Sequence, residues 1–146
     1  MKRLAFLLAL LPAVALAHGG ALATAAGEPG QLADVQRTVR IGMDDAMRYT
    51  PNVLTVRRGD TLRLLVSNHG AVMHEIVLGT SEEIEHHLHA MRSDPAMAHG
   101  APYMAHVAPG EEAQLIWRFT QSGTMHYACL LPGHYEAGMT GTIAVR

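Results

Sequence analysis

Three residues near the C-terminus combine side chains that bind metals. Cys129, His134 and Met139 follow one another with four residues between each consecutive pair. Cys129 is the only cysteine, so it has no internal disulfide partner. Pro132 and Gly133 make a helix implausible here, and the segment is expected to be a loop between two strands. Such a loop can bring a thiolate, an imidazole and a thioether around one point.

One further histidine would complete a set of two imidazoles, a thiolate and a weak axial thioether, the type 1 arrangement for copper. A thiolate binds Cu(II) covalently, imidazoles suit both oxidation states, and a soft thioether favours Cu(I). His74 is the preferred fourth ligand because it begins an apolar strand, V-M-H-E-I-V-L, directly after a turn, where a rigid sheet can hold it. His69 is the competitor, but it lies inside an N-H-G turn and is expected to be solvated.

Other readings of this motif explain less of it. A lone buried cysteine is often only a small apolar residue, but that leaves the spacing of the histidine and methionine unexplained. A cysteine–histidine pair can be a nucleophile and its base, yet no motif supplies an orienting group or an oxyanion hole. Structural zinc prefers more cysteines and does not choose methionine. A copper oxidase needs further His-x-His pairs, and the one pair, His87 and His89, stands on a predicted helix. We therefore expect a copper protein that is not an enzyme.

The N-terminus has the order of a secretory signal peptide. Two positive charges are followed by an apolar run and then by A-L-A, which predicts cleavage after Ala17. The apolar run, Leu4–Ala17, has 14 residues. A membrane-spanning helix needs about 20. We expect residues 1–17 to be a signal peptide, a periplasmic location, and no membrane insertion after cleavage.

Composition supports copper and excludes several partners. The 10 histidines and 9 methionines, against only 2 phenylalanines, supply borderline and soft ligands. Without residues 1–17 the chain has 129 residues, the size of one domain, and 9 basic against 13 acidic residues. This acidic balance offers no basic surface for nucleic acid or an anionic membrane.

From residue 35 onward the pattern is that of short strands. Leu115, Trp117 and Phe119 share one face of a predicted strand, and Pro109-Gly110 marks the turn before it. Residues 18–34 are small and aperiodic, and we expect a flexible leader there, followed by one domain over residues 35–146. Such strands and turns predict an all-β sandwich. The predicted strands are Val35–Met43, Asn52–Arg57, Thr61–Ser67, His74–Leu78, Gln114–Thr120, Thr124–Cys129 and Gly141–Arg146.

In one segment, Thr80–Arg92, the apolar residues recur with the period of a helix instead of a strand. Thr80 can cap this helix, and Glu83 can complete a capping box. Apolar residues then recur at the spacing of an amphipathic helix, at Ile84, Leu88 and Met91. We expect one short helical insertion lying on the sandwich.

Histidines and methionines gather in and after this insertion. The loop predicted over Ser93–Ala108 either forms a second, softer copper site or is a polar surface loop. Its candidate ligands are Met97, His99, Met104 and His106. The helix carries three further histidines, for which we favour a solvated face over a metal site: His86, His87 and His89.

The chain resembles the cupredoxins, the family of plastocyanin and azurin, from about Val35 to Arg146. The resemblance is carried by Y-T-P-N-V-L-T-V-R-R-G-D-T, by the first histidine, and by G-T-M-H-Y-A-C-L-L-P-G-H-Y-E-A-G-M-T-G-T-I-A-V. It implies a Greek-key β-sandwich (cupredoxin-like) with one copper at one end. The implied ligands are His74, Cys129, His134 and Met139. Many members have asparagine after the first histidine, where this chain has Glu75.

The motif V-M-H-E-I-V-L-G-T, the His/Met-bearing insertion and M-A-H-V-A-P-G-E look most like exported cupredoxin-like proteins linked with bacterial copper tolerance. Two functions are therefore expected. The first is one-electron transfer to a periplasmic redox partner, such as a cytochrome or a copper-handling protein. That partner would dock where Leu130, Leu131 and Pro132 ring His134. The alternative is copper buffering or delivery, with the additional His/Met-rich site engaged.

Overall fold

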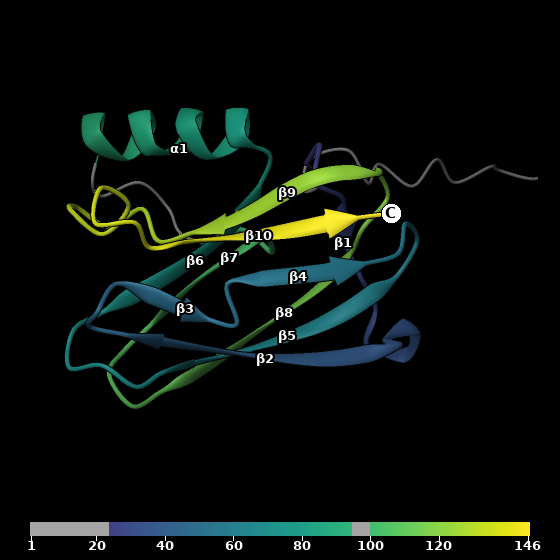
Figure 1. Cartoon of the computed structure of the whole chain (residues 1–146), viewed down its shortest axis with the longest axis horizontal. Helices are drawn as coiled ribbons and strands as arrows, with labels where there is room; N and C mark the ends of the chain where they lie inside the picture. Colours follow the sequence, from purple (N-terminus) through teal and green to yellow (C-terminus); the bar gives the residue numbers. More distant parts are fainter. Residues whose placement is uncertain (1–23, 95–99) are drawn as a thin grey trace, which may run out of the picture.

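Alternating buried and exposed side chains run along most strands, as expected when one face of a sheet covers a core. In Val53–Val56, for example, Leu54 and Val56 are buried while their neighbours are exposed. A computed structural model describes residues 24–94 and 100–146. In this part of the chain two five-stranded sheets pack face to face, and one α-helix lies outside them (Figure 1). The predicted β-sandwich with a helical insertion is confirmed.

Parallel pairs occur once in each sheet, between β2 and β5 and between β4 and β10. The strands of the first sheet, in spatial order, are β1 (Glu28–Pro29), β8 (Glu112–Arg118), β5 (Thr61–Asn68), β2 (Arg37–Asp44) and β3 (Arg48–Thr50). Those of the second are β4 (Val53–Val56), β10 (Thr140–Val145), β9 (Gly123–Ala128), β6 (His74–Gly79) and β7 (Met104–Val107).

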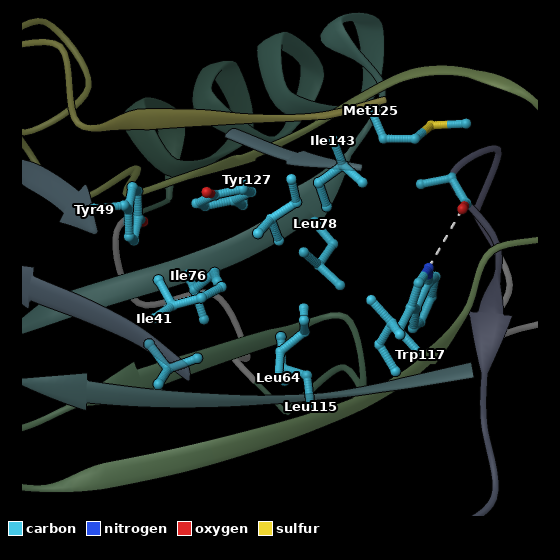
Figure 2. Packing of buried hydrophobic residues seen from close by; sticks show 14 of the residues in the cluster. Ile41, Tyr49, Leu64, Ile76, Leu78, Leu115, Trp117, Met125, Tyr127 and Ile143 are labelled. Carbon is cyan, nitrogen blue, oxygen red and sulfur yellow. Dashed lines mark hydrogen bonds between the residues drawn. The ribbon is translucent and has the colours of Figure 1, made fainter. Parts of the chain in front are cut away.

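The core fills the space between the sheets. Figure 2 shows Leu64 and Leu115 of the first sheet facing Leu78 of the second. Tyr49 and Tyr127 meet edge to face, with ring centroids 4.9 Å apart, a geometry that aromatic pairs prefer. This core gives the strands fixed positions, and one of them, β6, carries a residue of the candidate metal centre.

The helix α1 (Ser81–Ser93) forms where its capping signals predict. Thr80 accepts a hydrogen bond from the Glu83 backbone, and the Glu83 carboxylate accepts one from the Thr80 backbone, so the capping box is confirmed. Ile84 and Met91 face inward, and Ile84 packs against Val77 of β6. The helix is therefore fixed on the outer face of the second sheet.

Three short strands were not predicted: β1, β3 and β7. The strand β1 and the 3-10 helix η1 (Leu32–Asp34) lie in the segment expected to be a flexible leader. Trp117 donates a hydrogen bond to the carbonyl of Ala26, and a side chain at Gly27 would collide with the Arg118 carbonyl. Small residues thus let the segment approach β8 closely.

The strand β7 lies in what was predicted to be a loop, because β6 offers it a partner. In the register, His74 faces Val107 and Glu75 faces His106. The predicted signal peptide, the start of the leader, Met97 and His99 lie outside the described residues. Among the described helices, none has the length and apolarity that a membrane crossing requires.

Candidate metal centre

The candidate ligands come from one strand and one loop. His74 is the first residue of β6 and is fully buried. Cys129 directly follows β9, and His134 and Met139 lie in the loop that leads from β9 to β10. The Cys129 N–H donates to the Met139 carbonyl at 3.1 Å, and the Met139 N–H donates to the His134 carbonyl at 3.1 Å. These bonds close the loop around the cysteine. Gly133 helps it turn, with φ of +83°.

Three ligand atoms converge at this point. One atom each from His74, Cys129 and His134 lies within 4.8 Å of the others. The Nδ1 atoms of the two histidines are 3.3 Å apart, and the Cys129 Sγ is 3.2 Å from the His134 Nδ1. Two imidazole nitrogens and a sulfur are donors that suit copper. His69 is exposed and lies outside this group.

A backbone hydrogen bond from the Cys129 N–H to the Met139 carbonyl places Met139 beside this group. Met139 is fully buried, like Cys129, and both belong to the core between the sheets. Its assignment as the axial ligand remains a prediction.

Burial changes the protonation of the two ligands on the loop. It raises the pKa of Cys129 to about 11, although backbone N–H groups of Leu131 and Glu75 partly offset this effect. Burial, and next the adjacent His74, lowers the pKa of His134 below its usual value. Near neutral pH the cysteine is therefore a thiol and His134 is a neutral imidazole. Because a metal binds the thiolate, metal binding must release the thiol proton.

Glu75, the residue after the first histidine, is fully buried and connects three parts of the site. Its N–H donates to the Cys129 Sγ at 3.3 Å. Its Oε2 accepts a hydrogen bond from the Leu130 N–H at 3.1 Å. Its Oε1 lies 3.0 Å from the Nε2 of His106 on β7. The carboxylate thus attaches the cysteine segment to β6 and β7.

Asp45, between β2 and β3, was not identified from the sequence. Its Oδ1 lies 3.2 Å from the Nε2 of His74, the ring nitrogen opposite the converging Nδ1. The Ala71 N–H donates to the Asp45 Oδ2 at 2.7 Å, and this bond lowers the pKa of the carboxyl. The two residues are 29 positions apart, and no local pattern in the sequence pairs them.

The segment predicted to be either a second copper site or a polar surface loop contains the strand β7 over Met104–Val107. Met104 is buried and packs with Val77 and Ile84 beneath the helix. His106, on the same strand as Met104, pairs with Glu75 of β6. On the helix, His86 and His89 are exposed, as expected for a solvated face.

The surface around His134 also differs from the expectation. Leu130 is only 1% exposed and packs in the core beneath the helix, so it cannot ring the histidine. Leu131 is half-buried and Pro132 is exposed. Two other apolar residues, Val72 and Met73, are 44% and 42% exposed just before His74.

Comparison with known proteins gives one family. Residues 35–146 match the family model of copper-binding proteins of the plastocyanin/azurin family. The chain is 46% identical over 134 residues to a copper-resistant cuproprotein, CopI, of Rubrivivax gelatinosus, covering 89% of this chain and 81% of the relative. It is 31% identical over 159 residues to the copper-resistant cuproprotein CopI of Pseudomonas aeruginosa, covering 89% and 85%.

A solved structure supports the fold. Reduced auracyanin from the photosynthetic bacterium Roseiflexus castenholzii superposes with a TM-score of 0.66 at 22% identity, covering 77% of this chain and 98% of that one. At this level of identity the likeness concerns the fold alone.

Proposed function

The chain belongs to the plastocyanin/azurin family of copper-binding proteins, and from this premise we propose that it is a periplasmic type 1 copper protein. In this proposal it transfers single electrons and serves copper tolerance. His74, Cys129 and His134 would hold the copper, with Met139 as a weaker fourth ligand. When bound, copper supplies reversible one-electron chemistry between Cu(II) and Cu(I).

The convergence of the three ligand atoms within 4.8 Å carries this proposal. His74 and Cys129 are fully buried, whereas His134 is half-buried. His134 is therefore the ligand through which a redox partner has the shortest access to the site. The partner we propose is a periplasmic cytochrome or copper-handling protein that docks at Pro132 and the neighbouring apolar surface.

The proposed role in copper tolerance rests on the relatives, and the proposed location rests on the N-terminal sequence. The relatives from Rubrivivax gelatinosus and Pseudomonas aeruginosa are named copper-resistant cuproproteins. The periplasmic location rests on the signal peptide predicted over residues 1–17.

A second candidate function is copper buffering or delivery, with redox transfer secondary. The names of the relatives favour it, because resistance can arise from holding copper as well as from electron transfer. It requires additional copper at the His/Met-rich segment. The burial of Met104 removes one of the four residues considered for that site. The two functions therefore differ in how many copper ions the protein binds.

Metal analysis after reconstitution with Cu(II) and removal of loosely bound metal tests the proposal. We expect one copper per chain, reversible reduction and reoxidation, and no loss of copper on replacing Met97 and His99 together with alanine. More than one copper per chain, with the excess lost in that double variant, would favour buffering. Copper that is bound but not reversibly reduced would contradict electron transfer.

A further inference from the structure

The two ring nitrogens of His74 face different groups. Its Nδ1 lies 3.3 Å from the Nδ1 of His134, on the side where the ligand atoms converge. Its Nε2 lies 3.2 Å from the Asp45 Oδ1. An ionised carboxylate only accepts hydrogen bonds, so the pairing places the His74 proton on Nε2. The Nδ1 then keeps its lone pair for a metal.

The Asp45 carboxylate is itself held in place. The Ala71 N–H donates to its Oδ2 at 2.7 Å, and the Val72 N–H approaches its Oδ1 at 3.4 Å. A side chain at Gly70 would collide with this carboxylate, so the glycine allows the close approach. Asp45 thus contacts both the His74 ring and the backbone that leads into His74.

The segment that Asp45 contacts is anchored to the sheet as well. Asn68, at the end of β5, is buried, and its Oδ1 accepts a hydrogen bond from the Gly70 N–H at 2.8 Å. Its Nδ2 donates to the Val72 carbonyl at 2.8 Å. Since β5 pairs with β2, which ends just before Asp45, the carboxylate and the segment it binds share one rigid support.

We propose that Asp45 is a positioning residue of the copper site, which fixes the orientation and tautomer of His74 and favours Cu(II) over Cu(I). This role rests on the proposed copper site. A carboxylate bound to the outer nitrogen of a metal-binding histidine makes the ring a stronger donor. Its negative charge stabilises a divalent ion more than a monovalent one. The side chain is 43% exposed, so water weakens but does not remove this effect.

Three variants test the role. Asp45→Ala removes the hydrogen bond and the charge. Asp45→Asn keeps one accepting oxygen for His74 and removes the charge together with the acceptor for the Ala71 N–H, so it maintains the test even if the alanine variant folds poorly. Asp44→Asn is the matched control, because Asp44 is the neighbouring carboxylate and hydrogen-bonds the Ala46 N–H instead.

Cu(II) affinity and reduction potential are the first measurements. We expect Asp45→Ala to bind Cu(II) about 10- to 100-fold more weakly, the usual cost of losing such a partner. Asp45→Asn should fall between Asp45→Ala and the wild type, and Asp44→Asn should match the wild type. If Cu(I) affinity is unchanged, each tenfold loss raises the potential by about 59 mV. A purely structural role would weaken both oxidation states equally and leave the potential unchanged.

Nitrogen NMR of the copper-free protein is the second measurement. We expect His74 to carry its proton on Nε2 in the wild type and to lose this preference in Asp45→Ala. Unchanged affinity, potential and tautomer in both Asp45 variants would overturn the role of Asp45 while leaving the copper site intact. A wild-type protein that binds no copper at His74 would instead overturn the proposed function, and the role of Asp45 with it.

Discussion

Replacing Glu75 with alanine should destabilise the copper-free protein strongly for a single side chain. The carboxylate is fully buried and is the hydrogen-bond acceptor for the backbone N–H of Leu130, itself 1% exposed. Without it that buried donor is unsatisfied, which costs about 1–3 kcal/mol. The lost methylene adds about 0.8 kcal/mol. His106 is partly exposed, so water can replace its partner and we assign it no further cost. The expected loss is about 2–4 kcal/mol.

Urea unfolding of the copper-free protein measures this loss directly. Glu75→Gln is the informative companion, because it keeps the methylene groups and one oxygen for Leu130. We expect it to lose about 1 kcal/mol or less, the net value of one ordinary hydrogen bond. Glu85→Ala, an exposed glutamate on the helix, should change stability by no more than about 0.5 kcal/mol.

Two results would refute this reasoning. A loss below about 1 kcal/mol in Glu75→Ala would mean that the Leu130 N–H finds another partner. Equal losses in the alanine and glutamine variants would mean that the oxygen bound to Leu130 is not what stabilises the segment.

Three further predictions concern other parts of the structure. Because burial raises the pKa of Cys129 to about 11, its thiol is protonated at pH 7. Cu(II) binding should then release this proton and tighten about tenfold for each pH unit up to that pKa, and pH-independent binding by calorimetry would contradict this. Thr80→Ala should lose about 1 kcal/mol in urea unfolding because it removes the acceptor for the Glu83 N–H, whereas Thr80→Ser should keep most of it. Gly141→Ala should lose about 1–3 kcal/mol because the added methyl group would collide with the Tyr127 ring, and an unchanged midpoint would show that this contact relaxes freely.

The sequence predicts the loop between β9 and β10 because its signal is local. Cys129, His134 and Met139 lie on one short segment, and their chemical types restrict the metal before any fold is known. The long strands and the helix are also predicted, since their alternation, apolar stripe and capping box are patterns within one segment. His74, the candidate ligand that lies on a strand, is proposed from its place at the start of an apolar run.

What the sequence does not predict depends on which strands become neighbours. The pairs Asp45–His74 and Glu75–His106 are 29 and 31 positions apart. The second pair forms because the register sets Glu75 opposite His106, and a single sequence does not carry a register. The strand β7 was missed for a related reason, because its four residues gain strand structure only beside β6.

Titration of the copper-free protein with Cu(II), followed by visible absorption and metal analysis, tests the central claim most directly. The account predicts intense thiolate-to-copper charge-transfer absorption that saturates at one copper per chain and is absent in Cys129→Ser. His74→Ala should change its intensity or energy, whereas replacing the exposed His69 should not. A wild-type protein without this absorption, or an unchanged spectrum in Cys129→Ser, would contradict the claim that His74, Cys129 and His134 form a type 1 copper site.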